Sequence, residues 1–473
     1  MKKIGVFICN YNGKEDLLNC IHSLFRQTIR EFDIHVVDNA STDGTVETLQ
    51  EQFGDQVAVI CNPENLGGAG GFDRGLRTGL EKQYEYIVLL DNDIALDENV
   101  LENMCIYLDT HREVGLVGSK VMIMDRPDVL QDYGDYLDFE IFREQFGYGG
   151  HKDDESLPPE NECDYVPSCA IMIRSEILKK SGTMPVDNFI YYDDIELSHK
   201  IRLSGGKIVA LGNAKVWHKG GFRKETVNTF GRYYFLRNRL HFFAKYISDE
   251  EIERFVDAIL QEVFSQLAGF YSKGMREVFV TTMYAFDDFL HQVRGKAADD
   301  KILQILPHET PFVKVLRGEK SIIIKFLEGV HREEPLKAYQ ALLGILEEIQ
   351  KNEPRNQVWI SLEQCGCGEE EFRNYYQKAV GLKKSEYSLP ELLFTEQDMD
   401  SCLILRMCKH VKEVEKPVFP EIYVDQYCNC IASEEDYHFF TEMEVNKRFF
   451  VNMYRPLMMR AVKNIREGMK NEK

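Results

Sequence analysis

Short apolar runs alternate with helix-length segments over the first 125 residues, and this alternation restricts what the chain can fold into. Four such runs occur in order, namely KIGVFIC, DIHVVDN, VAVICN and EYIVLLDND, and a segment with helical spacing follows each of the first three. Apolar runs of this kind between helices of about 10–15 residues indicate βαβ units and a mostly parallel sheet. The sequence therefore predicts an α/β fold for this part of the chain.

Polar residues stand where each predicted strand ends. The stretches NYNG, DNAST, NPENLGGAGG and DND follow the four runs in that order. In a parallel sheet, ligands bind beyond the carboxyl ends of the strands. Four loops are thus expected to meet on one rim, and that rim is the predicted ligand site.

Asp91 and Asp93 lie one residue apart at the end of the fourth run. Alternate side chains of an extended backbone share a face, so both carboxylates can reach one hard cation. An exposed turn is the alternative, because Asp-Asn is common in turns. His218 ends another apolar strand, AKVWH. His218 could have a purely structural role, but as a third ligand beside two carboxylates it would suit Mn²⁺.

Five glycines occur between residues 67 and 75, in a stretch predicted to be a loop before a helix. Such a loop brings the backbone close to a bulky ligand and can direct N–H groups at phosphate. The stretch departs from G-x-G-x-x-G, because Asp73 occupies the third glycine position, and it lacks G-K-[ST]. A dinucleotide or P-loop site is therefore disfavoured. Asp38, after the second strand, can accept hydrogen bonds from a base or ribose, or can cap a turn.

Two adjacent aspartates occur in the stretch YYDDIE at residues 191–196. Asp193 and Glu196 have the spacing of a capping box, with Asp193 as the N-cap. That assignment places Asp194 at the first helical position, where the helix dipole favours its ionised form. Tyr191 and Tyr192 are expected to line the adjoining cleft.

The length of 473 residues predicts two or three domains. We place their boundaries at 1–245 for the α/β domain, 246–309 for a helical segment and 310–473 for a small C-terminal α/β module. Residues 126–165 are predicted to include an irregular surface loop. Ser248 and Glu251 form a capping box before an amphipathic helix.

A terminal helix is predicted over residues 456–470, with Pro456 in its first turn. Its apolar stripe would either dock on its own domain or lie on an anionic membrane, since basic residues flank it. The stripe consists of Leu457, Met458, Ala461, Val462, Ile465 and Met469.

The formal net charge of −21 disfavours nucleic acid as a partner. The first apolar run is too short for a signal peptide, and no stretch reaches the length of a membrane-spanning helix. We therefore expect a cytoplasmic protein, with peripheral contact to the inner face of the plasma membrane as an option. The pairs Cys365/Cys367 and Cys428/Cys430 are C-x-C, a spacing that disfavours zinc.

The family 2 glycosyltransferases, which have the GT-A fold, are the family that the ordered motifs resemble. The resemblance covers residues 4–295 and rests on FICNYNG, VVDNASTDGT, NLGGAGG, DND, FIYYDDIELSHKIRLSGG, AKVWHKGG and YYFLRNRL. Within that family the chain is most similar to galactofuranosyltransferases of cell-wall galactan synthesis and to rhamnosyltransferase-like enzymes. It has Phe235 where the former have His.

The resemblance implies roles at matching positions. Mn²⁺ or Mg²⁺ would bind Asp91, Asp93 and His218, and Asp194 would be the general base. The acceptor cleft would include Tyr191, Tyr192 and Asp193. The nucleotide-sugar would lie against Asn10, Asn12, Asp38, Asn65, Gly67, Gly68, Asp91 and Asn92.

The activity implied is inverting, metal-dependent sugar transfer from a UDP- or dTDP-sugar, with UDP-galactofuranose or dTDP-rhamnose favoured. The acceptor would be a glycan or a lipid-linked glycan of a bacterial surface polysaccharide. Two other functions stay open from the residues: a non-catalytic sugar-nucleotide-binding scaffold, which the uninterpreted C-terminal module motivates, and a nucleotidyltransferase.

Overall fold

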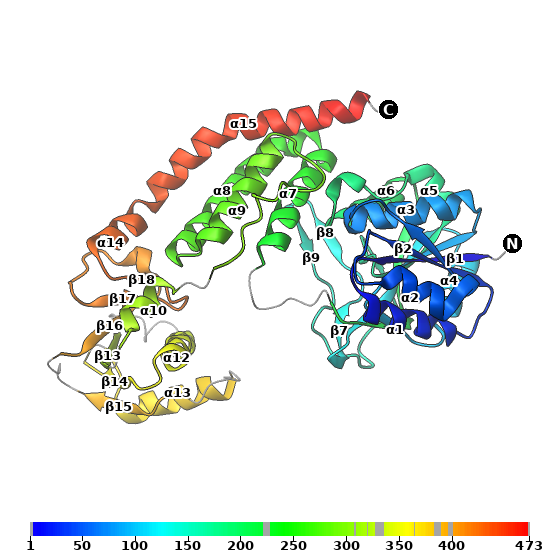
Figure 1. Ribbon diagram of the computed structural model, residues 1–473. Coiled ribbons are helices and arrows are strands. Elements are labelled where there is room, and N and C mark those ends of the chain that lie inside the picture. Colours follow the sequence, from blue (N-terminus) through cyan, green and yellow to red (C-terminus); the bar gives the residue numbers. More distant parts are fainter. Residues whose placement is uncertain are drawn as a thin grey trace. The chain divides into compact units, whose positions relative to one another are not determined.

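The computed structural model describes most of the chain and divides it into two units (Figure 1). The N-terminal unit comprises Met1–Ala258, Thr281–Leu303 and Leu457–Lys473, and the C-terminal unit comprises Ile259–Val280 and Gln304–Pro456. This division differs from the expected boundaries, because the helical segment and the terminal helix are each shared between units. The described residues are 3–220, 228–306, 309–318, 320–326, 335–363, 365–382, 389–395 and 401–471.

A ten-stranded sheet forms the centre of the N-terminal unit, in the order β10-β12-β6-β11-β4-β1-β2-β3, with β5 paired to β12 and β7 to β6. Strands β4, β1, β2 and β3 are parallel, as the alternating pattern predicted. The predicted α/β fold class is thereby confirmed. The strands are β1 (Ile4–Asn10), β2 (Phe32–Asp38), β3 (Val57–Cys61), β4 (Tyr86–Asp91), β5 (Ile94–Leu96), β6 (Val114–Ile123), β7 (Arg126–Asp132), β10 (Glu160–Cys163), β11 (Ala170–Arg174) and β12 (Lys207–His218).

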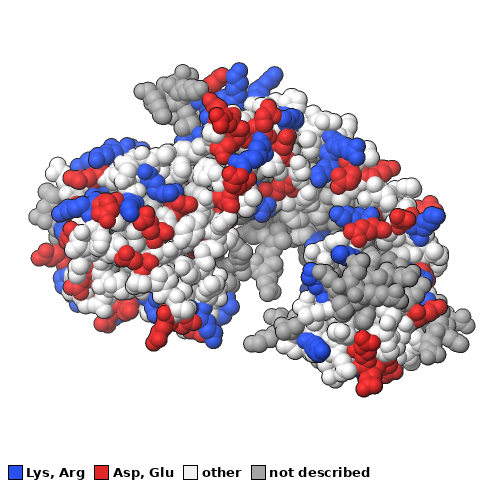
Figure 2. Space-filling view, turned by 180° about the vertical axis from the view of Figure 1, so that it is seen from behind, with Lys and Arg blue, Asp and Glu red and all other residues white. Residues whose placement is uncertain are grey.

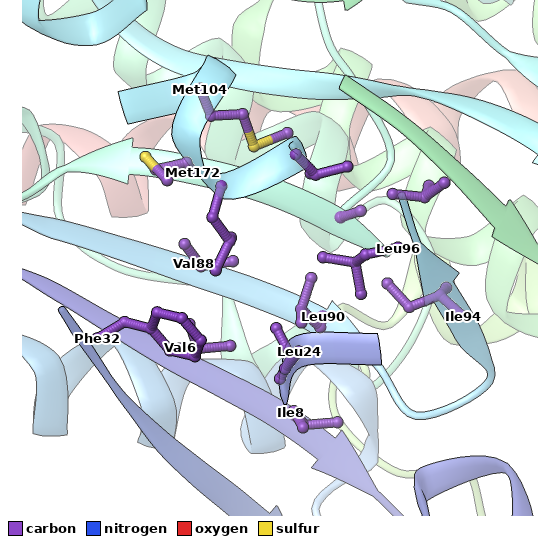
Figure 3. Packing of buried hydrophobic residues seen from close by; sticks show 14 of the residues in the cluster. Val6, Ile8, Leu24, Phe32, Val88, Leu90, Ile94, Leu96, Met104 and Met172 are labelled. Carbon is purple, nitrogen blue, oxygen red and sulfur yellow. The ribbon is translucent and has the colours of Figure 1, made fainter. Parts of the chain in front are cut away.

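Helices cover both faces of this sheet. One face packs on α1 (Lys14–Phe25), α2 (Thr45–Phe53) and α4 (Val100–Thr110), and the other on α3 (Gly67–Glu81), α5 (Ser175–Ser181) and α6 (Asp193–Leu203). Alternate residues of β1 serve the two layers, since Val6 and Ile8 join the first core and Phe7 the second. Figure 3 shows Val6 and Ile8 packed with Leu24, Val88 and Leu90.

Helix α3 begins at Gly67, so the glycine-rich stretch that was predicted to be a loop is helical. Close packing explains why glycines occupy these helical positions. A Cβ atom added to Gly71 would lie 2.3 Å from the Cys9 sulfur, and one added to Gly79 would lie 2.6 Å from Ile87. The glycines therefore let the helix approach β1 and β4 more closely than side chains would permit.

The last helix, α15, runs from Met443 to Asn471 and contains Pro456 in its interior. The predicted start at Pro456 was wrong, because helical residues continue on both sides of the proline. In the N-terminal unit, Met458, Ala461 and Val462 of this helix are buried. The docked alternative of the predicted stripe is thus favoured for these three residues over the membrane-facing one.

Arg466 of α15 donates to the Asp249 carboxylate at 2.6 Å and to the carbonyl of Ile247. The predicted capping box of Ser248 and Glu251 is present at the start of the helical segment. The helices of that segment are α8 (Ile252–Ser272) and α9 (Arg276–Leu290), and α7 (Thr229–Tyr246) precedes it. Within the described residues, no helix is both long enough and apolar enough to cross a membrane.

The C-terminal unit contains a six-stranded sheet in the order β15-β14-β13-β16-β17-β18, parallel except for β18. The predicted α/β character of this module is confirmed. Its elements are α10 (Pro311–Leu316), β13 (Ser321–Phe326), α12 (Pro335–Asn352), β14 (Gln357–Ser361), α13 (Glu369–Leu382), β15 (Leu392–Thr395), β16 (Leu403–Met407), β17 (Ile422–Val424), β18 (Cys430–Ile431) and α14 (Glu434–Thr441).

Acidic and basic side chains are interspersed over the face drawn in Figure 2. Neither sign gathers into a continuous area among the residues coloured there. On this face the coloured charges therefore form no large area of a single sign.

Candidate active site

Asp91, Asp93 and His218 come together at the carboxyl edge of the large sheet. Asp91 ends β4, and the turn that follows carries Asp93 into β5, which pairs antiparallel with β12 so that Ile94 lies opposite His218. The His218 Nε2 atom lies 3.1 Å from Asp93 Oδ1 and 3.6 Å from Asp91 Oδ2. One ligand atom from each residue lies within 4.8 Å of the others. The predicted ligands therefore form a cluster able to hold one cation.

The three side chains of this cluster shift one another's pKa values. Burial raises the pKa of Asp91 to about 6, although His218 opposes the shift. Burial also acts on Asp93, but its hydrogen bonds with His218 and with the backbone amide of Gly220 outweigh that effect and lower its pKa. Despite burial, the bond to Asp93 raises the pKa of His218 to about 11. A divalent cation would compete with the imidazole proton for these same oxygens.

Gln131, in β7, contacts the other nitrogen of the His218 ring. Its Nε2 atom lies 2.9 Å from Nδ1, while its buried Oε1 has no partner among the described residues. Amide orientation follows from the hydrogen-bond network, and the reversed amide would accept from Nδ1–H through Oε1. That arrangement directs the Nε2 lone pair at the carboxylates, as metal ligation requires. Two carboxylates and an imidazole held in this way fit Mn²⁺ or Mg²⁺.

The sequence pattern did not indicate a role for Gln131, because residues 126–165 were expected to include an irregular surface loop. The first part of that range is strand β7, which pairs with β6 and ends at Asp132. Burial, and then the neighbouring Asp135, raise the pKa of Asp132 well above its ordinary range. The short run LQDYGD, with polar residues after Leu130, was the one available signal.

The residues predicted to bind the nucleotide-sugar lie on the same rim. The Asn92 amide donates to Asn10 Oδ1 at 2.7 Å, and the Asn10 amide donates to Asp38 Oδ1 at 3.1 Å. Two others shape loops: Asn12 Oδ1 accepts from the Thr42 amide at 2.7 Å, and Asn65 Oδ1 from that of Gly67 at 2.8 Å. The parallel register explains the convergence, since Asn10 lies opposite Asp38. Contact with a nucleotide stays a prediction for these residues and for Gly68.

The predicted capping box at Asp193 is absent. Helix α6 begins at Asp193, its N-cap is Tyr192, and no side chain caps it. Tyr192 has a left-handed backbone with φ of 65°, which makes Asp193 the first helical residue and Asp194 the second. Glu196 accepts instead from Lys245 Nζ at 2.6 Å and from the Tyr246 hydroxyl at 3.1 Å.

The two aspartates differ in environment. Burial raises the pKa of Asp194 to about 6, while the backbone amides of Ile195 and Ser168 oppose the shift. The negative charge of Asp91 raises it further, so Asp194 lies within the field of the metal-ligand cluster. Burial, and then Asp194 itself, raise the pKa of Asp193 well above its ordinary range. Asp194 is thus the carboxylate that ionises near neutral pH.

Tyr191 and Tyr192 are placed differently from one another. The Tyr191 side chain is 37% exposed, as a cleft residue requires, whereas that of Tyr192 is 1% exposed. The Tyr192 ring packs on Phe235 and its hydroxyl donates to Glu144 at 2.7 Å. The side chain of Tyr192 therefore lies beneath the surface and does not line an open cleft.

Comparisons with known proteins bear on the class of enzyme. Residues 5–180 match the family model described as glycosyl transferase family 2. The chain is 30% identical over 102 residues to a cholesterol galactosyltransferase of Borreliella burgdorferi, covering 21% of this chain and 27% of that protein. It is 24% identical over 113 residues to the poly(ribitol-phosphate) beta-N-acetylglucosaminyltransferase TarS of Staphylococcus aureus, covering 24% and 20% of the two chains.

Among solved structures, S. aureus TarS 1–349 in complex with UDP-GlcNAc matches with a TM-score of 0.38 and 16% identity. The match covers 60% of this chain and 87% of that one. By contrast, the sequence matches to the two curated relatives named above cover less than a third of the length of each relative. These sequence matches support the predicted glycosyltransferase class of enzyme.

Proposed function

We propose that the protein is an inverting, metal-dependent glycosyltransferase that moves a sugar from a UDP- or dTDP-sugar to a glycan or lipid-linked acceptor. The observation that carries the proposal is the pairing of two carboxylate environments. Asp91 and Asp93 form a cation-competent cluster with His218, and Asp194 lies in the field of that cluster with a pKa of about 6.

The two groups have complementary tasks. When bound, a divalent ion supplies electrostatic stabilisation to the diphosphate that departs with added negative charge. The ionised Asp194 carboxylate takes the proton of an acceptor hydroxyl as that oxygen attacks the anomeric carbon. Attack from the face opposite the leaving group inverts the anomeric centre. The role of Asp194 as a base therefore fits an inverting enzyme.

The donor and acceptor classes have separate support. The rim of Asn10, Asp38 and Asn92 presents amide and carboxylate groups suited to a base or ribose. Among the proteins similar to this chain, one is named as a cholesterol galactosyltransferase and one as a poly(ribitol-phosphate) beta-N-acetylglucosaminyltransferase. We propose UDP-galactofuranose or dTDP-rhamnose as the donor and a bacterial surface polysaccharide as the acceptor.

The base assignment is tested with a matched pair of isosteric variants. Asp194→Asn removes the ionisable oxygen and should lower the transfer rate by about 100-fold or more, the lower range for loss of general-base catalysis. Asp193→Asn makes the same change at the neighbouring carboxyl group, whose pKa burial and Asp194 raise, and should lower the rate much less than Asp194→Asn does. The donor for this assay is selected by thermal shift with Mn²⁺ from a panel of nucleotide sugars.

Metal dependence is tested by calorimetry of UDP with Mn²⁺ and with EDTA, on wild type and Asp93→Asn. Binding should require Mn²⁺ and should weaken in the variant. Metal-independent UDP binding by the wild type, or transfer by Asp194→Asn at the wild-type rate, would refute the corresponding half of the proposal.

A further inference from the structure

One motif of the sequence, YYFLRNRL at residues 233–240, has no role in the chemistry described above. It lies in α7, where Arg237 is fully buried and Asn238 is 1% exposed. Buried polar groups are hydrogen-bonded in native proteins, so the partners of this pair show what the motif does.

Those partners belong to the segment that leads into α6. Phe189, Tyr191 and Tyr192 have left-handed backbones with φ of 66°, 64° and 65°. This conformation is uncommon for residues other than glycine, and it persists only where surrounding groups hold it. Three such residues within four positions directly precede the two aspartates.

A single side chain holds most of this segment. The Asn238 amide nitrogen donates to the carbonyl oxygens of Asn188 and Ile190 at 2.9 Å and of Tyr191 at 3.0 Å. Two N–H groups serve three acceptors, so one of them is shared. Because an alanine, serine or aspartate at this position cannot make the same set of bonds, the contact depends on the amide itself.

Arg237 determines how the Asn238 amide is oriented. Its Nε donates to Asn238 Oδ1 at 3.1 Å, which directs the amide nitrogen at the carbonyl groups. Its Nη2 donates to the carbonyls of Asn188 at 3.3 Å and Gly295 at 2.9 Å. The guanidinium lies over the rings of Tyr233 and Tyr234, with its carbon 5.2 and 5.1 Å from their centroids.

The remaining carbonyls of the segment are held by helix starts. The Ala69 amide, in the first turn of the glycine-rich helix α3, donates to Phe189 O at 3.1 Å. The Glu196 amide of α6 donates to Tyr192 O at 3.0 Å. Every carbonyl from residue 188 to residue 192 is therefore used, and the segment is fixed between the donor-side helix α3 and helix α7.

We propose that Asn238 is a positioning residue, which holds segment 188–192 so that Asp194 faces the donor rim at the correct place and distance. This inference rests on the proposed role of Asp194 as the base. Asn238 is buried and its amide nitrogen bonds to backbone carbonyls, so its effect on the rate would be exerted through the backbone that leads into α6. Arg237 supports it by fixing the amide.

The test compares Asn238→Asp with Asn356→Asp in the full chain. Asn238→Asp keeps the shape but replaces the donor nitrogen with an acceptor. Asn356 is a matched control, a buried amide of the C-terminal unit that donates to Leu316 O at 3.3 Å. Asn238→Asp should lower kcat about 100-fold, the effect of displacing a catalytic group by about 1 Å. The affinity for UDP with Mn²⁺ should stay within twofold, and Asn356→Asp should leave both unchanged.

Hydrogen exchange supplies a readout that does not depend on activity. Backbone amides in peptides covering 188–196 should exchange faster in Asn238→Asp, while those of β1 and β4 should not change. Asn238→Ser retains one hydroxyl donor without adding charge, and should show a smaller effect of the same kind; it decides the question if the aspartate variant does not fold.

Unchanged kcat together with unchanged exchange at 188–196 would overturn the inference. A parallel loss of UDP affinity and of protection throughout the N-terminal unit would also overturn it, because that pattern indicates a general structural role. If Asp194→Asn retains transfer, the proposed base fails, and the exchange data still show whether Asn238 holds the segment.

Discussion

Gly67→Ala tests whether the contact between α3 and segment 188–192 matters for both stability and rate. Gly67 has φ of 73°, and a Cβ atom added there would lie 2.1 Å from Phe189 O. The carbonyl would have to move by about 1 Å for that distance to reach 3.0 Å, below which real contacts essentially do not occur. Because this oxygen accepts from the Ala69 amide, the movement also removes a hydrogen bond.

Gly205 supplies a matched control. It has φ of 89° in the same unit, and nothing lies within 4 Å of an added Cβ atom. The left-handed conformation costs alanine about 1–2 kcal/mol. Restriction of the unfolded chain offsets about 0.4–1 kcal/mol of that cost. Gly205→Ala should therefore destabilise the N-terminal unit by about 1 kcal/mol. Overpacking adds about 1–3 kcal/mol in Gly67→Ala, for a total of about 2–4 kcal/mol.

The assay is urea unfolding followed by tryptophan fluorescence in a Trp359→Phe background. The chain has two tryptophans, so Trp217 in β12 then reports on the N-terminal unit alone. Transfer should fall about 100-fold in Gly67→Ala and stay near wild type in Gly205→Ala. Equal unfolding free energies for the two variants, with full activity in both, would refute the reasoning from close packing.

Three further predictions follow from the site and the core. The transfer rate should rise with pH across about pH 6, because burial raises the pKa of the Asp194 carboxylate and only its ionised form accepts a proton; a pH–rate profile that is flat between pH 5 and 8 would contradict this. Gln131→Ala should weaken Mn²⁺ binding by about 10–100-fold in calorimetry, which is the usual effect of losing the partner of a ligating histidine. Unchanged affinity would show that the contact between Gln131 and His218 does not matter for metal binding. Met458→Ala should destabilise the N-terminal unit by about 2–5 kcal/mol because Met458 is fully buried. The control Leu457→Ala, at an adjacent residue that is 46% exposed, should change the stability by no more than about 0.5 kcal/mol. Similar unfolding midpoints for the two variants would argue against docking of α15.

Periodicity made the parallel strands and the metal ligands predictable. Asp91 and Asp93 could be assigned to one face because side chains of an extended backbone alternate. His218 could be added because it ends an apolar strand, although the pairing of β12 with β5 that brings it to Asp93 is a tertiary contact. The strand ends at Asn10 and Asp38 were readable because both follow apolar runs of the same kind.

Backbone conformation was not readable in the same way. The capping box at Asp193 failed because a left-handed tyrosine precedes it, and tyrosine carries no sequence signal for that conformation. The glycines of α3 are typical of loops, and only their neighbours in the folded chain show that they permit close packing. Pro456 marks helix starts more often than helix interiors, so the first residues of α15 were missed.

The route of the chain through its two units has a consequence for biosynthesis. The N-terminal unit includes residues 281–303 and 457–473, which are separated from its main part by the C-terminal unit in the sequence. Ribosomes release the chain from its N-terminus, and domains usually fold as they emerge. Here the buried side chains of Met458, Ala461 and Val462 become available only after the C-terminal unit has been synthesised. The N-terminal unit can therefore bury these three side chains only after residues 457–462 have been translated, so the last step in completing this unit follows synthesis of the C-terminal unit.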